Sequence, residues 1–193
     1  MSLVGKKAPE FISKAVIKKK IDENFSLKKL HGKYVVLFFY PLDFTFVCPT
    51  ELHAFQEKLE EFHKKNAVVI GCSIDSIYSH LTWLEMPKSK GGIEGVSYPI
   101  VSDIKKEIST AYGVLNEEEG IAFRGLFIID RDGIIRHELI NDLFLGRSVD
   151  EALRVLDGII CYETQGEVCP ANWRCGEKAM KPTYEGVVDY MKK

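Results

Sequence analysis

The chain has 193 residues, of which 46% are hydrophobic and 28% charged, so it suits one globular domain or one domain with a tail and is neither disordered nor collagen-like. With 26 basic and 28 acidic residues, it lacks the positive field that holds nucleic acid. Residues 1–33 do carry nine lysines against three acidic residues. We interpret this arm as a solvated face and expect neither a nucleic-acid nor a membrane partner.

The apolar runs and the cysteines bound the location and the chemistry. The longest apolar run, residues 34–40, has seven residues, whereas a membrane helix needs about 20. The N-terminal sequence shows neither a secretory apolar stretch nor a transit pattern, so we expect a cytoplasmic protein. The five cysteines form no CxxC pair and no histidine lies at zinc-ligand spacing, so we expect no metal, no cofactor and no disulfide framework. Some of the thiols are therefore expected to be reactive.

Strand-like and helix-like patterns alternate along the chain. Continuous apolar runs are typical of buried strands, whereas apolar side chains at every third or fourth position indicate amphipathic helices. In chain order, these patterns predict a strand over 34–40, a helix over about 50–65, a strand over 67–72, a helix from the cap at Asp75 or Ser76 to 84, a strand over 98–101, a helix over 105–112, a hairpin over 122–139 and a helix over about 149–162.

This order predicts a mixed α/β sheet with helices on both faces, in a thioredoxin-like fold with an N-terminal extension. We divide the chain into a thioredoxin-like domain over 1–162 and a C-terminal tail over 163–193. In this layout the first helix presents its N-terminus at the sheet edge, where backbone N–H groups and the helix dipole favour an anion. Cys48 is predicted to occupy that position.

Cys48 is therefore the first candidate nucleophile. A helix N-terminus favours the thiolate, which is the reactive form of cysteine, and Pro49 suits the first helical position. The alternative is a packing role, since free cysteines are among the most buried residues. Thr45 favours chemistry, because its hydroxyl can face the sulfur, although it could instead cap the helix.

Arg124 lies inside the apolar segment AFRGLFII, where an unpaired guanidinium would be costly. A thiolate at Cys48 and the carboxylate of Glu51 are its expected partners. The alternative is an edge-strand arginine that reaches solvent.

The segment FYPLDFTFVCPTE resembles the active-site segment of the typical two-cysteine peroxiredoxins. Pro41, Thr45 and Cys48 reproduce the Pro-x-x-x-Thr-x-x-Cys motif of that family. The segments RGLFIID and NDLFLGRSVDEALR also match and supply Arg124 and Arg147 as the counterparts of its arginines. The similarity covers almost the whole chain.

The resemblance implies reduction of hydrogen peroxide or an organic hydroperoxide through a sulfenic acid on Cys48. By the same comparison, Arg124 stabilises the thiolate and the developing charge, and the Thr45 hydroxyl orients the peroxide. The resemblance implies three substrate-binding residues. Pro41 shields the sulfur from bulk water, Glu51 holds the guanidinium of Arg124 in place, and Arg147 is the second arginine.

Near the C-terminus, GEVCPA followed by Trp173 resembles the segment of the family's resolving cysteine, here Cys169. A thioredoxin carries its second thiol three residues after the first, but that position is Glu51 here, so the partner thiol comes from elsewhere in the chain or from another chain. The resemblance implies that Cys169 of the other subunit of a homodimer attacks Cys48, and that a thioredoxin-type reductant reopens the disulfide. It also implies a decamer of five dimers.

The other three cysteines have less distinctive surroundings. Cys72 ends a buried strand and Cys161 lies on the core side of the last helix, so both are expected to be structural. Cys175 is interpreted as a bystander, with a second resolving thiol as the alternative. His53 is expected to be an ordinary helix residue, because a preformed thiolate needs no base.

One departure from the family concerns overoxidation. Sensitive members carry Gly-Gly-Leu-Gly and a C-terminal Tyr-Phe, whereas this chain has Gly-Gly-Ile-Glu-Gly over 91–95 and ends Tyr-Met-Lys-Lys. The inserted Glu94 and the missing Phe put that sensitivity in question.

Two other functions remain as alternatives. One is an oligomeric holdase chaperone or a redox-signalling binding protein, whose function comes from assembly. The other, a general disulfide oxidoreductase, is disfavoured by the absence of CxxC.

Overall fold

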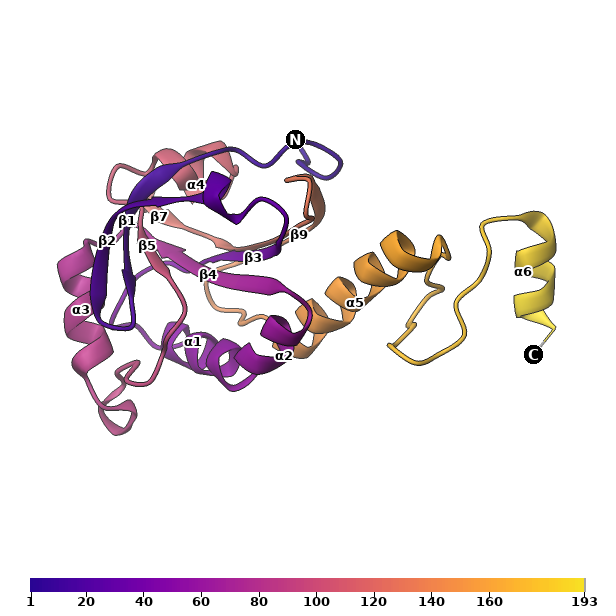
Figure 1. Ribbon diagram of the computed structural model, residues 1–193. Coiled ribbons are helices and arrows are strands. Elements are labelled where there is room, and N and C mark those ends of the chain that lie inside the picture. Colours follow the sequence, from indigo (N-terminus) through magenta and orange to yellow (C-terminus); the bar gives the residue numbers. More distant parts are fainter. Residues whose placement is uncertain (193) are drawn as a thin grey trace. The chain divides into compact units, whose positions relative to one another are not determined.

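The computed structural model describes residues 1–192 (Figure 1). Its strands are β1 (Ile12–Ile17), β2 (Lys20–Ser26), β3 (Tyr34–Phe39), β4 (Ala67–Ser73), β5 (Ile100–Ser102), β6 (Leu115–Asn116), β7 (Ile121–Ala122), β8 (Arg124–Ile129) and β9 (Ile135–Asn141). Its helices are α1 (Cys48–Glu57), α2 (Leu59–Lys64), α3 (Ile77–Glu85), α4 (Glu107–Ala111), α5 (Val149–Gln165) and α6 (Tyr184–Met191). Within residues 1–192, no helix has the length and apolar character needed to cross a membrane.

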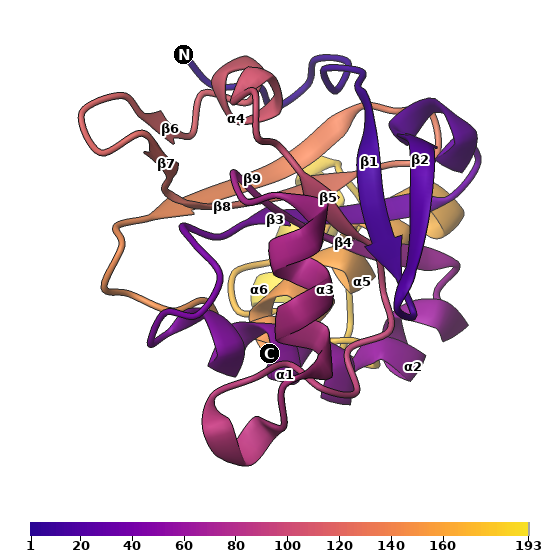
Figure 2. The ribbon, with the colours of Figure 1, turned by 90° about the vertical axis from the view of Figure 1, so that its left-hand side faces the viewer.

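Seven strands form one mixed sheet in the order β2-β1-β5-β4-β3-β8-β9. All six residues of β3 are buried, and this strand pairs with β4 in parallel and with β8 in antiparallel orientation. β8 and β9 form the predicted hairpin, whose turn contains Gly133 with a φ of 79° that favours glycine. In Figure 2, α4 lies on one side of the sheet, and α1 and α2 lie on the other. The predicted mixed α/β sheet with helices on both faces is confirmed.

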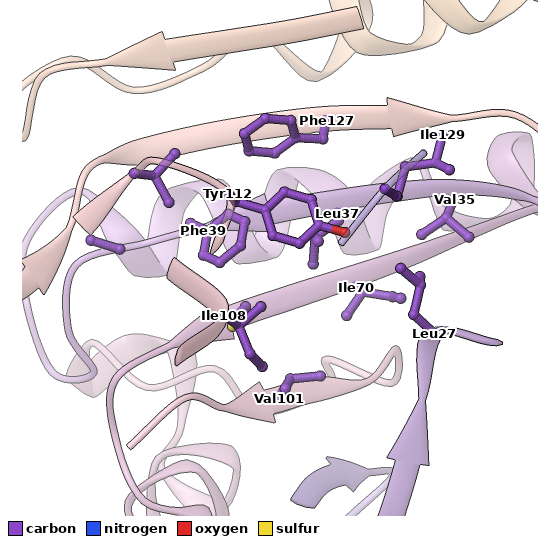
Figure 3. Packing of buried hydrophobic residues seen from close by; sticks show 14 of the residues in the cluster. Leu27, Val35, Leu37, Phe39, Ile70, Val101, Ile108, Tyr112, Phe127 and Ile129 are labelled. Carbon is purple, nitrogen blue, oxygen red and sulfur yellow. The ribbon is translucent and has the colours of Figure 1, made fainter. Parts of the chain in front are cut away.

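Alternate side chains of β3 pack on opposite faces of the sheet. Phe39 belongs to a buried cluster with Tyr112 and Phe127, whose ring centroids are 4.9 Å apart (Figure 3). On the opposite face, Phe38 stacks on Phe55 of α1 with ring centroids 4.3 Å apart. The second contact fixes α1 against β3 and thereby fixes the position of the helix N-terminus.

Several elements differ from the sequence prediction. The patterns do not predict the hairpin of β1 and β2, because β2 (KIDENFS) is mostly polar and lies at the edge of the sheet. The single helix over 50–65 is wrong: it is two helices, because the backbone leaves helical geometry at Lys58 (φ −97°, ψ 3°). The tail contains α6, which Thr183 caps by accepting a hydrogen bond from the backbone N–H of Gly186.

The chain divides into two compact units, Met1–Val149 and the segment from Asp150 onward. The first unit contains both sheets and helices α1 to α4, and the second contains nearly all of α5 together with α6. The sequence prediction places its boundary after residue 162, so the two divisions differ in where they place α5.

Candidate active site

Cys48 lies where a loop meets a helix. β3 ends at Phe39, a loop over 41–47 follows, and α1 begins at Cys48 with Pro49 in its first turn. The N-cap residue Val47 has helical angles (φ −80°, ψ −35°), and no side chain caps the helix. The backbone N–H groups of this turn favour negative charge. The predicted position of Cys48 is confirmed, whereas a capping role for Thr45 is wrong.

The Cys48 side chain is fully buried and touches two polar groups. Its Sγ lies 2.8 Å from Thr45 Oγ1 and 3.4 Å from Arg124 Nη1. Thr45 Oγ1 also lies 2.8 Å from the carbonyl oxygen of Leu42. A hydroxyl has one hydrogen and two lone pairs, so it can accept from a thiol while donating to Leu42, or donate to a thiolate. Thr45 therefore fits both protonation states of the sulfur.

Arg124 is the first residue of β8 and is only 3% exposed. Its Nη1 donates to Glu51 Oε2 at 2.7 Å as well as to the sulfur, and its Nε donates to the carbonyl of Leu143 at 2.7 Å. Both expected partners, Cys48 and Glu51, are therefore in contact with this guanidinium. The alternative of a solvent-reaching arginine is wrong.

Arg147 shares the carboxylate of Glu51 with Arg124. Its Nε and Nη2 donate to the two carboxylate oxygens at 2.7 and 2.8 Å, and its backbone N–H donates to Oε1 at 2.9 Å. Its Nη1 donates to the carbonyls of Phe39 and Gly125, each at 2.6 Å. Two buried guanidinium groups and one carboxylate leave one positive charge uncompensated, and the fully buried sulfur in contact with Arg124 is where a balancing negative charge would lie.

A second set of buried polar groups anchors the loop before Cys48. Asp43 accepts hydrogen bonds from the hydroxyls of Tyr40 at 2.9 Å and Ser79 at 2.8 Å, and it pairs with His80 Nδ1 at 2.8 Å. Pro41 is buried at the start of the same loop. No local pattern in the sequence indicates this set, because its members come from the loop and from α3, more than 30 positions away.

Two contacts hold the middle of α1. The Tyr98 hydroxyl donates to the carbonyl of Leu52 at 2.8 Å, and His53 Nε2 lies 3.0 Å from the carbonyl oxygen of Gly92. His53 is 9% exposed, so it is a buried contact residue as well as a helix residue. No local pattern indicates either contact, since both partners are about 40 positions away in the sequence.

Cys169 belongs to the second unit, where it is partly buried against a small cluster of Cys161, Trp173 and Ala179. Its thiol lies 3.7 Å from the carbonyl oxygen of Gly158. Burial, together with the neighbouring Cys161, raises the pKa of Cys169 to about 11. At neutral pH the packed Cys169 is therefore a thiol.

The other three cysteines differ in exposure. Cys72 and Cys161 are buried and Cys175 is exposed, and all five cysteines are free. Within residues 1–192, no group of three or more His, Cys, Asp or Glu side chains is placed to hold a metal ion. The first unit thus brings together Thr45, Cys48, Glu51, Arg124 and Arg147, with Pro41 buried in the loop before Cys48, while Cys169 lies in the second unit.

Comparisons with known proteins agree over the whole length. The AhpC/TSA family matches residues 4–138, and the C-terminal domain of 1-Cys peroxiredoxin matches residues 161–193. Thioredoxin peroxidase of Echinococcus granulosus is 49% identical over 98% of this chain and 98% of its own length. Alkyl hydroperoxide reductase C of Helicobacter pylori is 53% identical over 98% of this chain and 96% of its own. The structure of a reduced 2-Cys peroxiredoxin of Plasmodium vivax matches with a TM-score of 0.97 and 46% identity, with 100% of both chains covered.

These matches confirm the predicted thioredoxin-like fold and the family resemblance. They also agree with the geometry, in which one buried sulfur lies at a helix N-terminus beside a guanidinium. The chain belongs to the AhpC/TSA family, as a 2-Cys peroxiredoxin, and is a thiol-dependent peroxidase.

Proposed function

We propose that Cys48 reduces hydrogen peroxide and organic hydroperoxides. The Cys48 thiolate attacks one peroxide oxygen, the O–O bond breaks, and a sulfenic acid forms while the other oxygen takes up a proton and leaves as water or an alcohol. The proposal rests on one observation: the cluster of Arg124, Glu51 and Arg147 has one uncompensated positive charge and contacts the sulfur of Cys48. The Helicobacter pylori relative is named an alkyl hydroperoxide reductase, which supports an organic substrate as well.

The other site residues act by position and charge. Arg124 stabilises the thiolate and the charge that develops on the peroxide oxygens. The Thr45 hydroxyl donates a hydrogen bond to the sulfur before the attack and to a peroxide oxygen as negative charge moves onto it. Glu51 holds both guanidinium groups in place, and Arg147 ties that carboxylate to the carbonyl of Phe39 at the end of β3. Pro41 excludes bulk water. The distances around Cys48 support the roles of Thr45, Arg124, Glu51 and Arg147, and the burial of Pro41 supports its own.

Cys169 of the partner subunit resolves the sulfenic acid in our proposal. Its sulfur attacks the Cys48 sulfur and expels water, so that an intersubunit disulfide forms. A homodimer, and a decamer of five such dimers, is supported by the edge strand β9 and by the exposed rings of Phe46 and Phe144, which are 93% and 78% exposed.

A thioredoxin-type dithiol protein then reduces the disulfide and returns both thiols. The Echinococcus granulosus relative is named a thioredoxin peroxidase, which supports this reductant. A cytoplasmic location, where thiols stay reduced between turnovers, is part of this proposal.

A mixing experiment tests the cross-subunit pairing. Cys48→Ser and Cys169→Ser are purified separately, allowed to exchange subunits, and treated with one equivalent of hydrogen peroxide. Each variant alone should give no disulfide-linked dimer on non-reducing electrophoresis, whereas the mixture should give one, because each mixed dimer retains one complete pair. A mixture that shows no dimer band at any time after the peroxide is added, including the earliest, would contradict pairing between subunits.

Turnover tests the chemistry itself. Peroxide consumption driven by a thioredoxin system should vanish in Cys48→Ser, while a chaperone activity that depends on assembly should persist. Survival of peroxide consumption in Cys48→Ser would overturn the assigned nucleophile.

A further inference from the structure

The tail brings Cys169 back onto α5. The helix ends at Gln165, and Gly166, with a φ of 68°, donates its N–H to the carbonyl of Tyr162 at 2.9 Å and reverses the chain. Cys169 then lies on the helix at Gly158, whose carbonyl oxygen is 3.7 Å from its sulfur. A Cβ at Gly158 would stand 3.6 Å from that sulfur, so the thiol packs directly on this glycine.

Cys161 is placed beside this thiol. It follows Gly158 by three positions on α5, and residues at that spacing share one face of a helix. Cys161 is 7% exposed and forms a cluster with Trp173 and Ala179, against which Cys169 packs. The Cys161 thiol lies 3.6 Å from Gln165 Oε1, one turn further along the same helix. The two thiols are therefore direct neighbours within one unit of one chain.

The proposed function gives Cys161 no role, yet its neighbour is the thiol that enters the disulfide with Cys48. We propose that Cys161 is a relay thiol. It attacks Cys169 in the intersubunit disulfide, releases Cys48 and forms a Cys161–Cys169 disulfide within one chain. This step rests on the proposed function, since it needs the Cys48–Cys169 disulfide as its starting point. It replaces the expectation that Cys161 is only structural.

The step is a thiol–disulfide exchange without net oxidation. The deprotonated sulfur of Cys161 attacks the sulfur of Cys169, the Cys48–Cys169 bond breaks, and Cys48 leaves as a thiolate. The proton lost by Cys161 goes to solvent. The external dithiol then reduces the Cys161–Cys169 disulfide instead of the intersubunit one, so electrons still come from the same reductant.

Two features of the structure favour this direction. Thiolates that are well stabilised leave faster, and Cys48 departs into its contacts with Thr45 and Arg124. The attack is also intramolecular, because Cys161 and Cys169 are eight positions apart in one chain and pack against the same small cluster when both are free, so it competes well with an external thiol.

Peptide mapping tests the relay directly. The wild-type chain receives one equivalent of hydrogen peroxide without reductant and is then alkylated and digested. Trypsin leaves both thiols in the peptide 155–174, and cleavage after Glu163 or Glu167 separates them. We expect a peptide lighter by two hydrogens whose fragments stay joined after the second cleavage, together with a disulfide-linked dimer band that weakens with time.

Cys161→Ser and Cys161→Ala should keep the dimer band at full strength and should stop after one equivalent of peroxide per subunit. The wild type should consume further peroxide, because the exchange frees Cys48 again. Cys175→Ser, which removes the exposed tail thiol, is the matched control and should behave as the wild type.

The outcomes distinguish failure of the relay from failure of the proposed peroxidase cycle. A stable dimer band in the wild type, without a Cys161–Cys169 peptide, overturns the relay and leaves the peroxidase cycle intact. If the exchange is lost in Cys175→Ser but not in Cys161→Ser, the relay role of Cys161 is overturned and Cys175 is the thiol that attacks the intersubunit disulfide. If the Cys48–Cys169 disulfide forms in none of the proteins, the proposed resolution step fails, and the relay fails with it. Labelling of the sulfenic acid on Cys48 shows that each variant is folded.

Discussion

At the scale of single residues, Glu51 is the point on which the charge balance of the site depends. One buried carboxylate accepts hydrogen bonds from Arg124 and from Arg147, and all three side chains are almost fully buried. Removing one partner of a buried ion pair leaves an uncompensated charge. The site is therefore expected to tolerate the loss of this carboxylate poorly.

We predict that Glu51→Gln lowers the free energy of unfolding by about 3–5 kcal/mol, because two guanidinium groups lose their shared anion. Urea denaturation measures this change, and peroxidase activity should fall as well. Glu57→Gln on the same helix is the control: Glu57 pairs with Lys88 at 3.4 Å with a 69% exposed side chain, so its loss should change stability by less than about 1 kcal/mol. Equal effects of the two substitutions would contradict the assigned role.

The resolving thiol predicts a pH dependence. Because packing raises the pKa of Cys169 to about 11, its thiolate fraction grows about tenfold per pH unit below that value. Disulfide formation after a peroxide pulse should therefore accelerate from pH 6 to pH 9. Cys161 contributes to the raised pKa, so Cys161→Ala should move the profile toward lower pH. Stopped-flow fluorescence follows this phase, and a flat profile would show that Cys169 leaves its pocket before it ionises.

At the scale of elements, our proposal requires α1 to open during the cycle. The Cys48 side chain has no exposed surface, so the partner's thiol reaches it only after the first turn unwinds. His53 and Tyr98 oppose this motion, because they tie α1 to the carbonyl of Gly92 and to the segment before β5. The loop that carries the inserted Glu94 thus contacts α1 through Gly92, two positions before it.

We predict that His53→Ala speeds disulfide formation and raises the peroxide concentration at which Cys48 is overoxidised, since it removes one tie on α1. Mass spectrometry of sulfinic acid at Cys48 measures the second effect. His63→Ala is the matched control, because His63 lies in α2 with half of its side chain exposed. A similar shift in both variants would argue against the tie.

Much of the fold and the site follows from the sequence, for identifiable reasons. β3 and β4 are continuous apolar runs, and the buried Arg124 demands an anion, which the structure provides in Glu51. The polar edge strand β2 carries no such pattern. The pairing of Asp43 with His80 depends on which loops the finished sheet brings together, which local periodicity does not encode.

At the scale of the whole molecule, exposed apolar side chains indicate surfaces for assembly. Phe46 belongs to the loop before Cys48. Its ring is 93% exposed, so a large apolar side chain lies almost entirely in solvent when the chain is alone. In our proposal a second copy covers this ring. The same surface lies close in sequence to the nucleophile, so assembly and turnover are expected to be coupled.

We predict that Phe46→Asp shifts the protein toward smaller species in sedimentation velocity and lowers the yield of disulfide-linked dimer. Ile12→Asp, at a 72% exposed position in β1, serves as the control and should leave both unchanged. An unchanged sedimentation profile for Phe46→Asp would remove this ring from the interface.

The small cluster around Trp173 has a consequence for turnover in the cell. Trp173 donates to the carbonyl of Glu177 at 3.0 Å and packs with Ala179, and the neighbouring Arg174 and Lys178 are basic and exposed. When Cys169 departs for Cys48, this cluster loses a member and the chain around those basic residues loosens. A subunit held in the intersubunit disulfide is thus expected to be a better substrate for trypsin-like proteases, and exchange to a Cys161–Cys169 disulfide would end that exposure by returning Cys169 to the cluster.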